Sequence, residues 1–277
     1  MIADLHCHTK LSDGSTGLED LITVARRRRI RCIAITDHDT MAGCIRAARL
    51  GERQGIRVIH GVEFSCYDYT RKRKVHVLCY RAEKPDRLEG LCKQIGENRK
   101  KAAVEMIKKT MMLYPITPEQ VIKAASGSTN IYKQHIMRAL MNAGYATSVF
   151  CDLYGELFAS GGSCAVDIPY PDVFEVIEQI HGAGGIAVMA HPAMYDGYEL
   201  LEELCEKSLL DGIEVWNPKH TENDVRQFAE IAQTHGLLMT GGSDFHGMYT
   251  KEPTPLLACS TPDAQIRRLL EFKAEAR

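Results

Sequence analysis

The chain has 277 residues, of which 45% are hydrophobic and 25% charged, a composition typical of a soluble globular protein. Its formal net charge of -2 provides no overall attraction for nucleic acid. An anionic substrate would therefore need positive charge that is concentrated at one site. The length suits one barrel-sized domain, with or without a small insertion.

The cysteines indicate a reducing compartment. All ten are scattered and they form no C-x-x-C pair, which argues against a disulfide scaffold and against a cysteine zinc site. No apolar run approaches the ~20 residues of a membrane span, and the first residues do not resemble a signal peptide. We therefore expect a cytoplasmic protein with reduced thiols, without a membrane contact or an obligate protein partner.

Residues 1 to about 82 alternate short β-branched runs with helical stretches, the pattern of βα units and a parallel sheet. We expect one helix over residues 18–29 and another over residues 40–54, which Gly55 ends. The basic residues 71–74 lie between two apolar runs, and this arrangement predicts a hairpin loop.

From residue 85 the pattern becomes helical, with no strand that ends in a metal-type ligand. Helices are expected over residues 88–112 and near 117–126, 131–143 and 147–159. The alternation then resumes, with helices over 171–183, 197–208 and 221–235, strands over 185–190, 212–216 and 237–241, and a last helix from Pro262. We expect a barrel formed by residues 1–84 and 163–277, and an all-helical inserted domain, residues 85–162, that could cover the strand ends.

Histidines or carboxylates follow six of the apolar runs. In a β/α barrel the functional residues gather at the C-terminal ends of the strands, so these side chains should converge. His6 and His8 are two residues apart, and strand residues with this spacing face the same way. Each motif is a weak signal by itself, since Asp13 is also typical of a turn and His76 of a buried core histidine.

Together, nine residues occupy compatible positions: His6, His8, Asp13, His38, Glu63, His76, His191, Asp244 and His246. Mixed imidazole and carboxylate ligands favour zinc, manganese or iron over magnesium or calcium. Nine ligands are too many for one ion but suit two or three divalent ions. An isolated carboxylate at a buried strand end is costly, so Glu63 suits a position between two cations. We expect these nine residues to be the metal ligands and, with the ions, the catalytic centre.

In their order along the chain, these motifs resemble the signature of the PHP (polymerase and histidinol phosphatase) superfamily. The matching segments are His6-x-His8, Asp13-Gly14, Thr36-Asp37-His38-Asp39, Gly61-Val62-Glu63, His76, Ala190-His191-Pro192 and Gly242-Ser243-Asp244-x-His246. The resemblance implies a distorted seven-stranded β/α (TIM-like) barrel with a trinuclear metal centre. It implies one ion on His6, His8, Glu63 and Asp244, a second on Glu63, His76 and His191, and a third on Asp13, His38 and His246.

The helical block resembles one branch of that superfamily. This branch contains stand-alone enzymes that act on nucleoside monophosphates, on 3′,5′-bisphosphorylated nucleotides and on 5′ ends of short RNA. Its Asn-Arg pair is matched by Asn98 and Arg99, but its usual Arg-Pro-His-Ile-Ala segment is replaced by Lys133-Gln134-His135-Ile136-Met137. Lysine keeps the positive charge and loses the two-pronged phosphate geometry of arginine. If the helical block folds over the site, Arg99, Lys133 and His135 are the candidates to orient the phosphate or base of a substrate. The alternative for each is an ordinary helix residue without a substrate contact, such as a solvated Arg99 on the long helix.

We therefore expect a metal-dependent phosphoric ester hydrolase whose metal-bridging hydroxide attacks phosphorus. The expected substrates are AMP, 3′,5′-bisphosphorylated nucleosides or 5′ ends of short RNA. Three alternatives remain open: a histidinol-phosphate phosphatase, an amidohydrolase-like metal hydrolase and an inactive nucleotide-binding module. The helical insertion argues against the first, the poor fit of the paired glutamate and aspartate motifs against the second, and the complete ligand set against the third.

Overall fold

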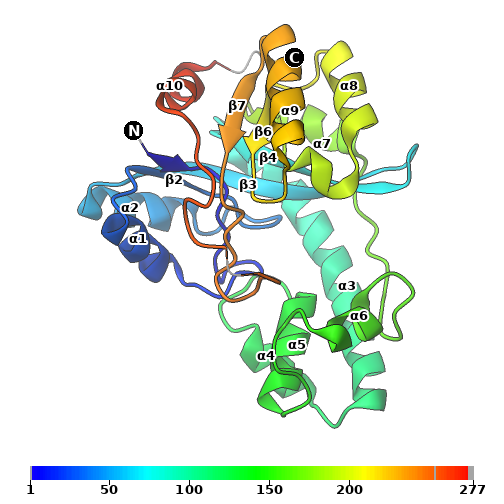
Figure 1. Ribbon diagram of the computed structural model, residues 1–277. Helices are drawn as coiled ribbons and strands as arrows, with labels where there is room; N and C mark the ends of the chain where they lie inside the picture. The colour runs from blue at the N-terminus through cyan, green and yellow to red at the C-terminus, as the bar shows by residue number, and fades with distance from the viewer. Residues whose placement is uncertain (1, 253, 274–277) are drawn as a thin grey trace.

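The computed structural model describes residues 2–252 and 254–273. Over these residues, seven strands form one sheet whose order follows the chain. The strands are β1 (Ala3–Asp4), β2 (Cys32–Ile35), β3 (Arg57–Asp68), β4 (Arg73–Tyr80), β5 (Ile186–Met189), β6 (Gly212–Trp216) and β7 (Leu238–Gly241). Helices lie on the outside of this sheet, and a further helical group extends away from it (Figure 1). The expected α/β barrel is confirmed.

Hydrogen bonds between the two ends of the sheet nearly close it into a barrel. Leu5 N donates to Gly241 O at 3.2 Å, and His8 N donates to Phe245 O at 2.9 Å. A side chain at Gly242 would overlap the backbone of His6, so only glycine permits this close approach. The closure brings the first histidine motif beside the last aspartate motif, although they lie at opposite ends of the sequence.

The hairpin predicted around the basic residues 71–74 joins β3 to β4, so β4 departs from the parallel order of the other strands. This strand is antiparallel both to β3 and to β5, whereas β1, β2 and β3 are parallel neighbours, as are β5, β6 and β7. Only residues 69–72 join β3 to β4, and a parallel return needs a connection of about a dozen residues or more. His76 therefore lies within β4, opposite Ser65, and not at a strand's C-terminal end.

Outer helices cover the sheet through their apolar faces. They are α1 (Leu18–Arg27), α2 (Cys44–Gln54), α7 (Val173–Gly182), α8 (Tyr198–Glu206), α9 (Glu222–Thr234) and α10 (Asp263–Glu271), with the short 3₁₀ helices η1 (Pro85–Leu88) and η2 (Pro192–Tyr195). The start of α2 lies four residues after the expected one. Asp39, which precedes this segment, has a φ of 55° and accepts a hydrogen bond from Ser65 N at 2.7 Å.

The helical lobe consists of α3 (Glu89–Leu113), α4 (Pro118–Ala124), α5 (Lys133–Asn142) and α6 (Asp152–Phe158). Leu91 and Ile95, near the start of α3, pack in the barrel core. Farther along α3, Met106 belongs to a separate apolar cluster with Ile136 and Leu140 of α5. Since this cluster is separate, we retain residues 85–162 as a proposed inserted domain, which shares the long helix α3 with the barrel (Figure 1).

Candidate metal centre

Glu63, on β3, lies at the middle of the candidate site and is buried. Its Oε1 atom is 2.8 Å from His76 Nδ1 and 2.9 Å from His191 Nε2. Its Oε2 atom lies between 3.0 and 3.3 Å from ring nitrogens of three further histidines, namely His6, His8 and His38. One carboxylate therefore faces five imidazoles from four parts of the sheet, as expected of a residue placed between cations.

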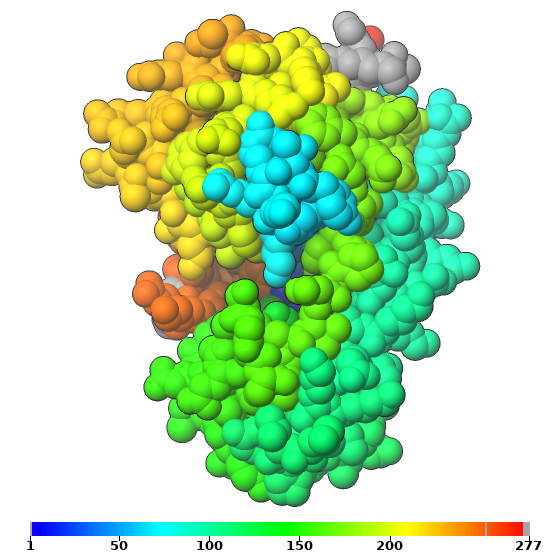
Figure 2. All heavy atoms as spheres, turned by 90° about the vertical axis from the view of Figure 1, so that its right-hand side faces the viewer, coloured from blue at the N-terminus to red at the C-terminus, as the bar shows by residue number. Residues whose placement is uncertain are grey.

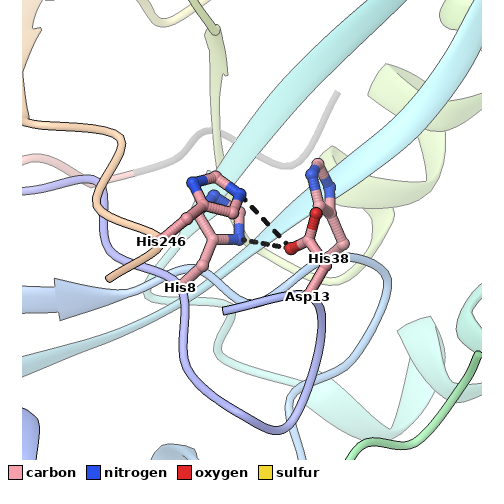
Figure 3. A group of neighbouring side chains, drawn as sticks. All are labelled: His8, Asp13, His38 and His246. Atoms are coloured by element: carbon pink, nitrogen blue, oxygen red, sulfur yellow. Dashed lines mark ion pairs between the residues drawn. The ribbon is translucent and has the colours of Figure 1, made fainter. Parts of the chain in front are cut away.

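Three overlapping groups have ligand atoms that all lie within 4.8 Å of one another. They are His8, Asp13, His38 and His246 (Figure 3); His6, His8, Glu63 and Asp244; and His38, Glu63 and His76. The group of His6, His8, Glu63 and Asp244 is the same as the ligand set that the resemblance implies for the first ion. The other two differ in detail, because His8 joins the Asp13 group and His38 lies with Glu63 and His76. Eight of the nine predicted ligands belong to these groups, and the ninth, His191, lies 2.9 Å from Glu63.

Buried polar atoms that make no hydrogen bond indicate that these side chains fit a divalent cation. The Nδ1 atoms of His8, His38, His76 and His191 and the Oε2 atom of Glu63 make no hydrogen bond of acceptable geometry among the described residues, although Glu63 lies at ion-pair distance from His38 Nδ1 and His76 Nδ1. Buried polar groups in proteins are normally satisfied, so a cluster of such exceptions needs an explanation. A bound cation would satisfy nitrogen and oxygen donors together, and imidazole with carboxylate is a common donor set for transition metals.

The charges at this site also differ from those of isolated side chains. Burial acts to raise the pKa of Glu63, but the neighbouring histidines outweigh it and hold this pKa well below its usual range. The pKa of Asp244 is low for the same reason. Burial lowers the pKa of His38 well below its ordinary value, which favours the neutral imidazole that binds metals. Although burial opposes it, hydrogen bonds to Asp244 and Glu63 raise the pKa of His8 to about 10.

Two buried carboxylates behind the centre hold its ligands in place. Glu214, on β6, lies 2.9 Å from His6 Nδ1 through Oε1, and its Oε2 atom accepts a hydrogen bond from His191 N at 2.8 Å. Asp4 accepts hydrogen bonds from Ser243 N at 2.9 Å and Ser243 Oγ at 2.6 Å, next to the Asp244 motif. We missed Asp4, although a carboxylate inside a buried apolar run was an available signal. Such outer partners orient metal ligands.

A cleft of about 320 Å³ opens above the centre and includes Glu63 and His76 among its lining residues. The helical lobe contributes Gln134, Phe150 and Tyr154 to its wall. Lys219 and Lys251 also line it. Figure 2 shows this face hollowed between the tip of the β3–β4 hairpin and the helical lobe. No local motif marked the two lysines or the aromatic residues, since they meet only in the folded chain.

The three predicted substrate contacts have partners within the protein. The guanidinium of Arg99 lies 2.8 Å from Asp39 Oδ2 and is placed between the rings of Tyr132 and Tyr170, at 4.8 and 5.2 Å. Lys133 Nζ donates to Phe158 O at 2.8 Å, and His135 Nδ1 accepts from Tyr132 N at 3.1 Å. The described residues that line the cleft do not include these three. Their contact with a substrate stays a prediction.

Comparison with known proteins gives the family. The PHP domain matches residues 4–160, and the chain belongs to the PHP family. It is 39% identical over 255 residues to phosphoribosyl 1,2-cyclic phosphate 1,2-diphosphodiesterase of Eggerthella lenta, a match that covers 91% of this chain and 97% of that enzyme. It is 31% identical over 255 residues to the 3′,5′-nucleoside bisphosphate phosphatase of Chromobacterium violaceum, covering 88% of this chain and 86% of that one. It is 30% identical over 256 residues to the Escherichia coli 5′-3′ exoribonuclease Rnm, covering 89% and 85%.

Solved structures agree with this assignment. A Bifidobacterium adolescentis protein, provisionally described as a metal-dependent phosphoesterase, superposes with a TM-score of 0.88 at 29% identity, over 97% of this chain and 95% of that one. A Chromobacterium violaceum protein described as an amidohydrolase, with bound sulfate and no metal, has a TM-score of 0.78 at 29% identity, over 91% and 92%. The chain is a metal-dependent phosphoric ester hydrolase. In residues 2–252 and 254–273, no helix is long and apolar enough to cross a membrane.

Proposed function

We propose that this chain binds two to three divalent cations and hydrolyses a phosphoester of a small phosphorylated ribose compound. The supporting observation is the set of three overlapping histidine and carboxylate groups beside one cleft. The proposed ligands are the nine residues His6, His8, Asp13, His38, Glu63, His76, His191, Asp244 and His246. Their mixed donors favour zinc, manganese or iron. When bound, such ions would neutralise phosphoryl charge and make water more acidic.

The residues around these ligands have separate proposed roles. Glu214 and Asp4 keep the imidazoles and the Asp244 segment in place through the hydrogen bonds described above. Lys219 and Lys251 provide local positive charge at the cleft, which the net charge of the whole chain does not. The helical lobe forms one wall and limits the access of water and of large substrates. Arg99 supports that wall through Asp39, and a direct contact of Arg99, Lys133 or His135 with substrate remains part of the proposal.

We propose a cyclic phosphodiester of phosphorylated ribose as the first substrate to test. The relative that acts on phosphoribosyl 1,2-cyclic phosphate is 39% identical and is matched over 97% of its length. The two relatives that act on nucleoside bisphosphates or RNA are 31% and 30% identical. A cleft of about 320 Å³ is at the small end of ordinary ligand pockets, which favours a compact substrate.

A nucleotide is the second candidate, because aromatic side chains line the cleft. Phe150, Tyr154, Tyr195 and Tyr249 are all among its lining residues. Aromatic rings of this kind stack with bases of single-stranded nucleic acid and of nucleotides. AMP, a 3′,5′-bisphosphorylated nucleoside or the 5′ end of a short RNA would use such a surface. The ten free cysteines support our further proposal that the enzyme works in the cytoplasm.

The deciding experiment measures hydrolysis by protein that has been treated with a chelator and reloaded with Mn²⁺. The panel contains phosphoribosyl 1,2-cyclic phosphate, adenosine 3′,5′-bisphosphate, AMP, a 5′-phosphorylated RNA oligomer and histidinol phosphate. We expect metal-dependent turnover that is fastest on the cyclic diester. Faster turnover of the nucleotides would favour the second candidate, and turnover of histidinol phosphate alone would contradict both.

A pair of variants tests the centre itself. His8→Asn removes a residue that belongs to two of the three groups, and we expect activity to fall more than about a hundredfold. His235→Asn is the matched control, since His235 is exposed at the end of α9. Equal activity of both variants would contradict the assignment of the metal centre.

A further inference from the structure

The helical lobe is bonded to the loop that carries Asp13. Gln134, the second residue of α5, donates from Nε2 to Asp13 Oδ2 at 2.8 Å. The segment before α5 adds two bonds, from Ser128 Oγ to Ser12 O at 2.6 Å and from Thr129 N to Leu11 O at 2.9 Å. The position of this loop therefore depends on the helical lobe as well as on the barrel.

The two oxygens of Asp13 have different surroundings. Oδ1 lies 3.3 Å from His246 Nε2 and 3.8 Å from His8 Nδ1, and these are the ion pairs drawn in Figure 3. Oδ2 is the oxygen that accepts the hydrogen bond from Gln134. A carboxylate held at one oxygen by an amide presents the other in a defined direction. Because the amide is neutral, it orients the carboxylate and leaves its negative charge available to a cation.

A second contact from the helical lobe reaches the same group of ligands. The hydroxyl of Tyr132 donates to the backbone oxygen of His38 at 3.2 Å. His38 and Asp13 both belong to the group that also contains His8 and His246. In contrast, His6 in the neighbouring group is supported by Glu214, which lies on the barrel strand β6. The two groups are therefore positioned by different parts of the fold.

We propose that Gln134 is a positioning residue: by orienting Asp13 it sets the metal affinity of the group formed by His8, Asp13, His38 and His246. This inference rests on the proposed function, since it requires ions at the centre. The metal affinity of this group therefore depends on the position of the helical lobe.

The test compares the wild type with Gln134→Met, which has a similar length and no donor. Chelator-treated protein is titrated with Mn²⁺ against a fluorescent chelator, and the number and affinities of the bound ions are measured. We expect one ion to bind about 10- to 100-fold more weakly and the others to bind unchanged. Gln134→Asn, which is one methylene too short to reach Asp13, should have the same effect. Gln179→Met, at an exposed position of α7, should bind as the wild type does.

The possible results separate this inference from the proposed function. If the wild type binds no ion, the proposed function fails. If the wild type binds ions and both Gln134 variants bind them with unchanged affinity, the inference fails while the proposed function survives. If every ion is weakened equally, or if the chelator-treated variants lose their unfolding transition, Gln134 has only a structural role and the inference is overturned.

Discussion

Metal binding at this centre should release protons. The Nε2 atoms of His6 and His8 lie 3.1 Å apart and face Glu63 and Asp244. Burial acts to lower the pKa of His6, but the charges of Glu214, Glu63 and Asp244 raise it well above its ordinary value, and the pKa of His8 is raised to about 10. A cation needs the neutral form of these rings, so it must displace at least one proton.

The size of the effect follows from the pKa of His8. At pH 7, a proton held with a pKa of about 10 weakens the apparent affinity of a competing ion by about a thousandfold. Each additional pH unit should therefore strengthen binding about tenfold, until the pH approaches that pKa. Without metal, the stability of the fold depends on pH in the opposite direction, because it falls as the pH rises. A raised histidine pKa stabilises the fold fully below the unfolded value near 6.5, and this stabilisation is lost as the pH rises toward 10.

Isothermal titration calorimetry can measure the released protons directly. Chelator-treated protein is titrated with Zn²⁺ at pH 7 in two buffers of different ionisation enthalpy, and the difference in heat gives the proton count. The titration is repeated between pH 6.5 and 8.5, and we expect at least one proton and a rising affinity. Binding without proton release and with an affinity independent of pH would refute this reasoning. His8→Asn should release fewer protons, whereas His235→Asn should match the wild type.

Three further predictions concern single side chains. Glu214→Gln should weaken metal binding or lower activity about 10- to 100-fold, because it alters the support of His6 and His191; unchanged metal titrations would contradict this. Arg99→Leu leaves the buried Asp39 carboxylate without its cation and should cost about 3–5 kcal/mol in urea unfolding, and a loss under 1 kcal/mol would be evidence against this pair. Leu140→Ala should lower the free energy of unfolding by about 2–5 kcal/mol, because Leu140 is fully buried in the core of the helical lobe. If the variant unfolds at the same temperature as the wild type, this core contributes little to stability.

Much of the fold and of the candidate site could be predicted from the sequence, because both depend on local patterns. The buried runs of β2 and β5 predicted central strands, and the helical residues between 88 and 159 predicted a separate lobe. The spacing of His6 and His8 predicted two imidazoles on one side of a strand. The basic residues 71–74 between two apolar runs predicted the hairpin that makes β4 antiparallel to β3, whereas the antiparallel pairing of β4 with β5, across the helical lobe, had no local signal.

The tertiary structure decided which side chains meet. The closure of the sheet at Gly242 places the first histidine motif beside the last aspartate motif, and no local pattern encodes that contact. Arg99 has a charge that suits a phosphate contact, but in the fold it is buried beside Asp39 and forms an internal ion pair. A buried charge without a partner would destabilise the fold. Gln134 contacts Asp13 only because the helical lobe packs on the loop before α1. The sequence by itself determined the kinds of ligands and their spacing, because these follow from neighbouring residues. Their partners depend on long-range packing, which brings together residues whose separation in the chain carries no signal.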